Sequence, residues 1–302
     1  GHDGRPPIDM LIRLNPQVRP ETRAEFAVGA GTSKFGMDRD EALAAAAVTN
    51  GSGVRLRGVH VHVGSDLRDV IAWAEAGERA VRMLTELSPY ADKVDTVDFG
   101  GGFPLAGAGP SPGSFLRALL TALRDGGLSL PARPAIEPGR YLVGGAGWLV
   151  SRVLHARARP PVAQQVVLDA GMTELIRPTL YGSRHPVHAL PFNGSVSGGP
   201  VNAGVLYPSL LDTAVEGPVC ESTDTFGIHS LLPRMDRGDL VVIESAGAYA
   251  ALFTSRYNGR PQPAEVALGP DGSLQLCERP GIPDAQRRTA DLRSAPVSAA
   301  TV

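Results

Sequence analysis

The first 150 residues alternate between short apolar runs and longer stretches in which apolar residues recur every three or four positions. The short runs end at Gly, Pro or Asn, as strands do, and the longer stretches have helical spacing. The predicted strands are Ile8–Leu14, Val59–Val63, Val94–Phe99 and Pro134–Glu137, and the predicted helices are Glu41–Val48, capped by Asp38, Asp69–Leu87 and Phe115–Leu123. This order predicts parallel strands joined by crossover helices.

The pattern changes after residue 150, where short alternating runs are separated by turns rich in Gly and Pro. Strands are predicted near Val150–Ala156, Val166–Leu168, Leu240–Ile243 and Ala264–Leu268. We therefore predict an α/β part over residues 1–149, a mostly antiparallel β domain over 150–279 and a tail over 280–302. Residues 191–216 include a stretch without periodicity and are predicted to be an insertion.

Composition narrows the class of protein. The chain has 302 residues, 43% of them hydrophobic, and a formal net charge of -2, which argues against nucleic acid or an anionic membrane as a bulk partner. Two cysteines, Cys220 and Cys277, provide no disulfide framework, and no apolar run is long enough to span a membrane, so we predict a cytoplasmic protein. The chain contains only two lysines, Lys34 and Lys93.

Unusual residues stand where the predicted parallel strands end, which is the edge at which such folds place their active sites. One strand ends at His62 and Ser65, the next at Gly100–Gly102 and the last at Glu137 and Arg140. Glycine N–H groups, a hydroxyl and a guanidinium suit a phosphate, although a glycine triplet also serves tight turns. His60 and His62 share a strand face, but no third ligand has metal-site spacing, so we predict no metal.

In the second part, Arg177 and Tyr181 are four residues apart in a short helical pattern that follows the predicted strand Val166–Leu168. This spacing places both side chains on one helix face, where they suit a carboxylate; the alternative is a solvated Arg beside a packing Tyr. Cys220 lies in a Gly-Pro turn with Glu221 and is either a buried small residue or a reactive group.

Taken together, these segments resemble the fold-type III pyridoxal-phosphate decarboxylases of amino acids, most closely the diaminopimelate decarboxylase branch. The matching motifs, in the family's order, are LNPQV, SKFG, GVHVHVGS, DFGGGFP, EPGR, DAGMTELIRPTLYGSRHP, GPVCESTD, AGAY and YNGRPQPAEV. The resemblance implies an alanine-racemase-like (β/α)8 barrel, present here as its C-terminal part, followed by an antiparallel β-barrel or sandwich domain.

The resemblance also implies roles for individual residues. His62 stacks on the ring of pyridoxal 5'-phosphate, Glu137 pairs with the ring nitrogen, and Arg177 and Tyr181 bind the distal carboxylate of the substrate. The phosphate ligands implied are Ser65, Gly100, Gly101, Gly102, Gly139, Arg140 and Tyr249. Cys220, as proton donor, and Glu221, as a substrate ligand, come from the partner subunit of a homodimer. The implied reaction converts meso-diaminopimelate to L-lysine.

No segment matches the family's cofactor-binding lysine, because Lys34 lies in a different motif and Lys93 precedes a strand. A complete barrel needs about 250 residues, so we expect the chain to be the C-terminal two-thirds of an enzyme and to be inactive alone. FGGGFP has Phe-Pro where this branch more often has Leu-Gly. A related decarboxylase of another amino acid, ornithine-like or carrier-protein-linked, therefore stays an alternative, as do a non-catalytic dimerisation or binding homologue and a racemase.

Overall fold

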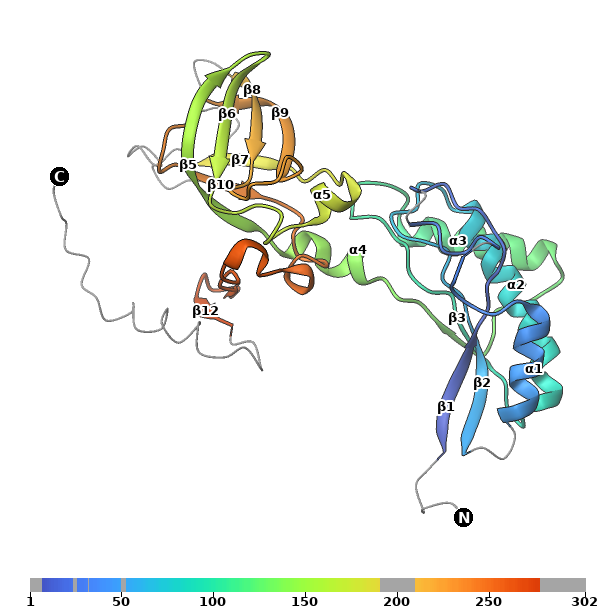
Figure 1. Ribbon diagram of the computed structural model, residues 1–302. Coiled ribbons are helices and arrows are strands. Elements are labelled where there is room, and N and C mark those ends of the chain that lie inside the picture. Colours follow the sequence, from blue (N-terminus) through green and yellow to red (C-terminus); the bar gives the residue numbers. More distant parts are fainter. Residues whose placement is uncertain (1–6, 24–25, 32, 50–52, 191–209, 278–302) are drawn as a thin grey trace. The chain divides into compact units, whose positions relative to one another are not determined.

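The computed structural model describes residues 7–190 and 210–277, apart from 24–25, 32 and 50–52 (Figure 1). The predicted insertion, as far as residue 209, and the predicted tail lie outside the described residues. The chain divides into two compact units. The N-terminal unit comprises residues 1–148 and 244–248, and the C-terminal unit comprises residues 149–243 and 249–302.

The N-terminal unit is built on a four-stranded parallel sheet with the strand order β1-β2-β3-β4. The strands are β1 (Ile8–Arg13), β2 (Val54–His60), β3 (Thr96–Asp98) and β4 (Arg133–Ala135). The helices are α1 (Arg39–Thr49), α2 (Ile71–Leu87), α3 (Pro112–Asp125) and α4 (Gly139–Val143), with 3-10 turns η2 (Ser88–Tyr90) and η3 (Gly144–Ala146). The predicted strand–helix alternation with parallel strands is confirmed.

The second predicted strand was placed too far along the chain, since β2 ends at His60 and not at Val63. Val61 and Val63 are buried as a strand pattern requires. The Val61 N–H still donates to the Asp98 carbonyl of β3 at 2.9 Å. The Val63 carbonyl, however, accepts hydrogen bonds from the loop N–H groups of Val28 and Gly29, 3.0 Å away in each case. The hydrophobic pattern thus indicates which residues are buried, but it does not indicate which segment forms the backbone hydrogen bonds.

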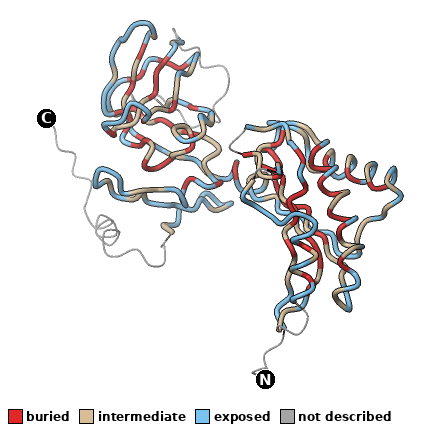
Figure 2. The backbone as a smooth tube through the Cα atoms, turned by 45° about the vertical axis from the view of Figure 1, so that its right-hand side comes forward, coloured by how far each residue is buried: buried red, intermediate tan, exposed pale blue. Residues whose placement is uncertain are grey.

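Helix α2 packs on β2 and β3, and helix α3 packs on α2; each buries one face, as the apolar spacing predicts. Figure 2 shows burial concentrated in the strands and on the inner sides of these helices. Four aromatic rings form the centre of this core, and Trp73 lies 5.6–5.9 Å from the rings of Phe99, Phe103 and Phe115. Phe103 and Phe115 meet edge to face at 5.1 Å, a favourable arrangement for aromatic pairs.

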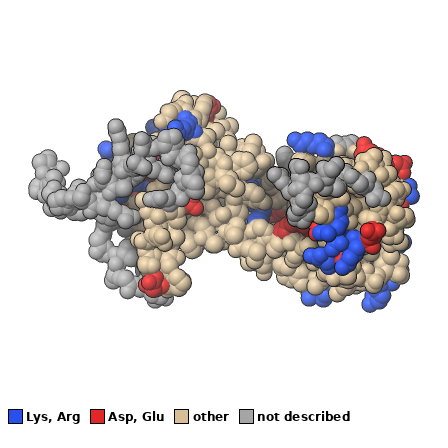
Figure 3. Space-filling model, turned by 90° about the horizontal axis from the view of Figure 1, so that it is seen from below, with Lys and Arg blue, Asp and Glu red and all other residues tan. Residues whose placement is uncertain are grey.

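Helix α1 begins with a capping box. The Glu41 N–H donates to Asp38 Oδ1 and the Asp38 N–H donates to Glu41 Oε2, each at 2.9 Å. The prediction that Asp38 caps this helix is therefore confirmed. Figure 3 shows Lys and Arg side chains beside Asp and Glu side chains on one face of the protein. Helix α2 carries two i,i+4 ion pairs, Glu75–Arg79 and Glu78–Arg82.

The C-terminal unit contains a curled six-stranded sheet with the order β7-β10-β5-β6-β8-β9 (Figure 1). Its strands are β5 (Leu149–Arg159), β6 (Val162–Leu168), β7 (Val187–Leu190), β8 (Leu210–Glu216), β9 (Thr225–Pro233) and β10 (Leu240–Ile243). All neighbouring pairs are antiparallel except β6 with β8. The prediction of a mostly antiparallel domain is confirmed.

Smaller elements complete this unit: α5 (Arg177–Tyr181), η4 (Ala251–Phe253), η5 (Tyr257–Gly259) and the hairpin of β11 (Val266–Leu268) with β12 (Leu274–Leu276). Strands β7, β8, β9 and β12 were not predicted, and β8 corrects the predicted insertion, whose last residues, Leu210–Glu216, form a strand of the sheet. β9 contains Gly227 with φ +93° and Leu231 with φ +65°, and its pairing with β8 shifts register twice, so its sequence does not alternate regularly. Among the described residues, no helix has the length and apolar character that crossing a bilayer requires.

The pairing of β2 with β3 depends on a glycine. A Cβ atom added to Gly58 would lie 1.7 Å from the Thr96 carbonyl oxygen, a contact that no small rearrangement relieves. We predict that Gly58→Ala lowers the free energy of unfolding by at least about 2 kcal/mol, as measured by urea denaturation.

Gly113→Ala is the matched control, because a Cβ there meets only the Arg117 guanidinium, at 3.5 Å, and a serine hydroxyl, at 3.8 Å. In helix α3 this change should stabilise the protein by up to about 1 kcal/mol. Equal stability of Gly58→Ala and the wild type would contradict the tight β2–β3 approach.

Candidate active site

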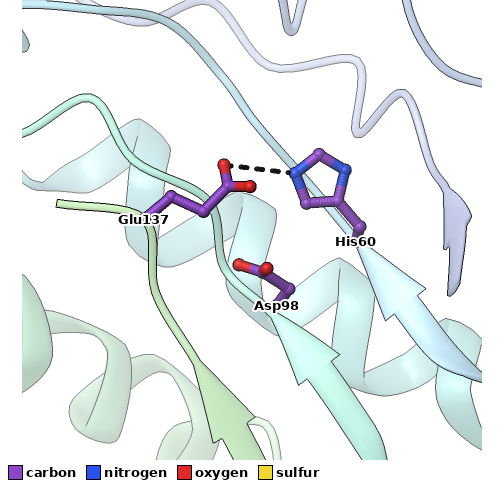
Figure 4. A group of neighbouring side chains, drawn as sticks. All are labelled: His60, Asp98 and Glu137. Carbon is purple, nitrogen blue, oxygen red and sulfur yellow. Dashed lines mark ion pairs between the residues drawn. The ribbon is translucent and has the colours of Figure 1, made fainter. Parts of the chain in front are cut away.

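The carboxyl ends of the four parallel strands place three polar residues in one row across the sheet. Arg13 of β1 is in register with His60 of β2, and His60 is in register with Asp98 of β3. Asp98 is in turn in register with Ala135 of β4. Residues in register across a sheet point to the same face. Glu137 follows Ala135 by two positions, and its carboxylate reaches the same group of side chains (Figure 4).

Glu137 lies between two histidines. Its Oε2 atom is 3.5 Å from His60 Nε2 and 3.7 Å from His62 Nδ1. The His62 contact is not an ion pair, because His62 Nδ1 accepts a hydrogen bond from the Gly101 N–H at 3.1 Å and so carries no proton. Burial, followed by the positive charge of Arg13, lowers the pKa of the His62 imidazole, which agrees with a neutral ring.

The glycine triplet permits close backbone packing beside these side chains. Gly100 and Gly102 have φ values of +69° and +100°, which favour glycine. A Cβ on Gly101 would lie 2.4 Å from the Glu137 carbonyl oxygen. Two N–H groups of the triplet are engaged locally, since Gly100 donates to Asp98 Oδ1 at 2.9 Å and Gly101 donates to His62.

A guanidinium and a hydroxyl meet at the same strand ends. Arg140 Nη2 donates to Ser65 Oγ at 2.8 Å, so the pair predicted from the sequence is brought together. The Gly139 N–H donates to the Glu137 carbonyl at 2.9 Å, and a Cβ on Gly139 would meet no atom within 4 Å. The N-terminal unit thus combines a guanidinium and a hydroxyl (Arg140 and Ser65) with a carboxylate (Glu137) and a neutral imidazole (His62). These groups suit a phosphorylated pyridine cofactor.

We predicted no metal from the sequence because no third ligand had suitable spacing. The strand ends, however, bring three possible ligands together. Ligand atoms of His60, Asp98 and Glu137 all lie within 4.8 Å of one another, although each comes from a different strand end (Figure 4). Such a group has no short-range sequence pattern, because its members are far apart in the sequence and are brought together by the pairing of the strands.

In the C-terminal unit, Arg177 and Tyr181 lie at the two ends of α5, on one face, as predicted. Arg177 is only 6% exposed, and its guanidinium carbon lies 5.5 Å from the Tyr181 ring centroid and 5.3 Å from that of Tyr249. Tyr249, predicted from the resemblance to hold phosphate, therefore contacts Arg177. It has φ +69°, an unusual conformation for a bulky residue and one that often accompanies function.

Cys220 and Glu221 lie in the exposed turn between β8 and β9, so the alternative of Cys220 as a buried residue is wrong. Asn258 Nδ2 donates to Cys220 Sγ at 3.3 Å, and the Tyr257 hydroxyl donates to Glu221 Oε1. This hydrogen bond raises the pKa of the Tyr257 phenol. Tyr257 and Asn258 thus fix both residues of the turn.

Two buried carboxylates hold the loops that carry these groups. Asp224 accepts from the Met172 N–H at 2.6 Å and from the Val219 N–H at 2.7 Å, which joins the turn before α5 to the Cys220 turn. Glu174 accepts from the Gly171 N–H at 2.8 Å and pairs with Arg260 at 3.3 Å. Because buried polar groups require hydrogen-bond partners, these contacts fix the loop geometry.

Neither lysine belongs to the groups described so far. Lys34 Nζ lies 5.2 Å from the Phe35 ring centroid, and Lys93 is 64% exposed and pairs with Asp95, which confirms that Lys93 is solvated. Phe103, the Phe of the divergent Phe-Pro pair, is a core residue. Its side chain therefore packs in the core of the N-terminal unit.

Comparison with known proteins identifies the family. Residues 39–247 match the model of the pyridoxal-dependent decarboxylase family described as the C-terminal sheet domain. The chain belongs to this family. The resemblance inferred from the motifs is confirmed.

Similar members of the pyridoxal-dependent decarboxylase family are diaminopimelate decarboxylases. The chain is 32% identical over 281 residues to that of Zymomonas mobilis, covering 92% of this chain and 63% of the relative. It is 33% identical over 257 residues to that of Deinococcus radiodurans, covering 85% and 61%. The Helicobacter pylori enzyme, solved in complex with L-lysine, matches with a TM-score of 0.74 and 30% identity, covering 89% of this chain and 64% of that one.

The chain thus spans less than two-thirds of the length of these relatives. Three features of the candidate site are not evident from the sequence alone: Arg13, the contact of His60 with Glu137, and the pairing of Tyr257 and Asn258 with the Cys220 turn. Strand register would have revealed the first two, since Arg13, His60 and Asp98 are strand-terminal residues.

The neutral state of His62 leads to a prediction. Its pKa should lie below 6.5, the ordinary value, in an NMR titration of the imidazole nitrogens. Removing the nearby positive charge with Arg13→Gln should raise this pKa. Arg55→Gln, at the other end of β2, should leave it unchanged.

The linked stability effect has a defined sign. Because the unfolded state binds this proton more readily, the stability contributed by neutral His62 is present above pH 6.5 and is lost as the pH falls towards the folded-state pKa. A His62 that titrates above 6.5 would contradict the assigned tautomer and its burial.

Proposed function

We propose that the chain forms part of a pyridoxal-phosphate-dependent decarboxylase that converts meso-diaminopimelate to L-lysine. The observation that carries the proposal is Arg177, a buried guanidinium held against two phenol rings in a family whose similar members act on diaminopimelate. Diaminopimelate has a second carboxylate, far from the reacting carbon, that such a guanidinium can bind. We also propose that the parallel sheet belongs to a (β/α)8 barrel.

Residues of the N-terminal unit would hold the cofactor. His62 would lie against its ring as a neutral imidazole, and Glu137 would pair with the pyridine nitrogen. The guanidinium and hydroxyl of Arg140 and Ser65 would bind the phosphate, with Gly102 and Gly139 close by. Gly100 and Gly101, whose N–H groups are engaged, would shape this cradle. When bound, pyridoxal phosphate supplies an electron sink for the α-carbon.

Side chains of the C-terminal unit would bind the substrate and provide the proton. Arg177 and Tyr181 would hold the distal carboxylate, with Tyr249 fixing the guanidinium; its assignment as a phosphate ligand stays a prediction. After carbon dioxide leaves, the Cys220 thiol would protonate the α-carbon, and Asn258 would orient its sulfur. Glu221, held by Tyr257, would bind an amino group of the substrate. As the resemblance implies, Cys220 and Glu221 would act from the partner subunit of a homodimer.

The alternative substrates have less support. The Phe-Pro departure that suggested another amino acid concerns Phe103, which is buried in the aromatic core. A non-catalytic homologue would have no need for the unusual Tyr249 backbone or for the buried Arg177. Both alternatives make different predictions in the experiment that follows.

The test uses the full natural polypeptide that contains residues 1–302, purified with pyridoxal phosphate. Supplied with meso-diaminopimelate, it should release L-lysine. Arg177→Gln should raise KM for diaminopimelate by about 10- to 100-fold, because a hydrogen-bonded charge pair is lost. Arg159→Gln, an exposed arginine of β5, is the matched control and should behave as the wild type.

Lysine release that is insensitive to Arg177→Gln would refute the assigned carboxylate ligand. Cofactor binding with turnover of a different amino acid would refute the substrate. No cofactor binding would favour the non-catalytic alternative.

The composite site predicts complementation between two inactive variants. Cys220→Ala removes the proposed proton donor, and Arg140→Ala removes a proposed cofactor ligand. When the two are co-expressed, half of the dimers are mixed and each has one intact site, so activity should recover to about a quarter of the wild-type value. Mixed dimers without activity would contradict the sharing of a site between subunits.

A further inference from the structure

His60 is a polar residue of the strand-end row for which the proposed function gives no role. It ends β2, its side chain is 19% exposed, and it lies in register between Arg13 and Asp98. Its Nε2 atom is buried and makes no hydrogen bond to any described residue. A buried polar nitrogen without a partner costs free energy of the order of 1–3 kcal/mol. A neighbouring group that can form a hydrogen bond with His60 Nε2 would remove this cost.

The closest carboxylate oxygen recorded for this nitrogen is Glu137 Oε2, at 3.5 Å (Figure 4). A shift of a few tenths of an ångström would bring the two atoms to hydrogen-bond distance. Asp98 is less available, because its Oδ1 atom already accepts the Gly100 N–H at 2.9 Å.

His62 cannot perform this role for Glu137. Its Nδ1 atom faces the same Oε2 atom at 3.7 Å but uses its lone pair to accept the Gly101 N–H. Arg13 acts on the group through its charge: burial lowers the pKa of its guanidinium and the negative charge of Glu137 opposes that shift. His60 Nε2 is therefore the N–H donor best placed to hold the carboxylate.

We propose that His60 is a positioning residue whose Nε2–H holds Glu137 Oε2 and so directs the other carboxylate oxygen at the pyridine nitrogen of the cofactor. This inference rests on the proposed function. By fixing the rotamer of a carboxylate that is 51% exposed, His60 keeps its negative charge where it stabilises a protonated ring nitrogen.

A divalent cation is the competing occupant of the same group. The three potential ligand atoms lie within 4.8 Å of one another, but the positive charge of Arg13 acts on Glu137 and would repel a cation. Among the described residues, this group offers three ligands. A zinc ion bound there would need water or substrate as its fourth ligand. The geometry therefore favours the hydrogen bond, and metal binding becomes an outcome of the test.

The test follows the protonation of the pyridine nitrogen in the full natural polypeptide loaded with ¹⁵N-labelled pyridoxal phosphate. In the wild type at pH 7.5, the ¹⁵N resonance should be that of a protonated ring. In His60→Phe it should move towards the position seen in Glu137→Gln, and kcat should fall by about 10- to 100-fold with KM unchanged. His60→Gln, whose amide can replace the Nε2–H donor, should retain the wild-type resonance, and His155→Phe, an exposed histidine of β5, is the control.

A wild-type ¹⁵N resonance in His60→Phe would overturn the proposal. So would tight Zn²⁺ binding to the cofactor-free protein that is lost in both His60→Phe and Asp98→Asn, which would assign the group to a metal. Failure of the wild type to bind the cofactor would refute the proposed function instead. In that case the contact is tested in the cofactor-free protein, where Glu137→Gln should shift the His60 Nε2 resonance and an unchanged resonance would refute it.

Discussion

The close approach of β2 to β3 is the constraint on which the strand-end group of the N-terminal unit depends. Gly58 lies so near the Thr96 carbonyl that no larger residue fits, and this fixes the register of the two strands. Two positions further along, the same register sets His60 opposite Asp98. A slip of one residue would turn His60 to the other face of the sheet. The imidazole–carboxylate group is therefore a consequence of backbone packing.

Backbone contacts also determine which nitrogen atoms near the strand ends are available. The glycine triplet bends with positive φ values and uses two of its N–H groups on Asp98 and His62. The second of these bonds fixes the tautomer of His62. In that tautomer His62 Nδ1 cannot donate to Glu137, which leaves His60 Nε2 as the proposed donor. One main-chain hydrogen bond thus distinguishes His60, the last residue of β2, from His62, two positions beyond it.

Much of this arrangement could be predicted from the sequence, for identifiable reasons. Helical spacing and the Asp38 cap placed α1 and α2, and the four-residue spacing placed Arg177 and Tyr181 on one face. What could not be predicted depends on long-range pairing. Strand β9 was missed because its bulges interrupt the alternation, and the Arg13–His60–Asp98 row was missed because it exists only across three strands. The hydrogen bond from Asn258 to Cys220 joins residues 38 positions apart, so no local sequence pattern predicts it.

The proposed reaction removes a carboxylate from an amino acid and protonates the α-carbon. The most direct measurement is turnover of ¹³C-carboxyl-labelled meso-diaminopimelate in D₂O by the full natural polypeptide with pyridoxal phosphate, followed by mass spectrometry. We expect one labelled carbon dioxide for each L-lysine formed and one deuterium at the new C–H position of that lysine. Deuterium in recovered diaminopimelate without release of carbon dioxide would identify a racemase, and unchanged substrate would identify a non-catalytic protein; either result would contradict the proposed decarboxylation.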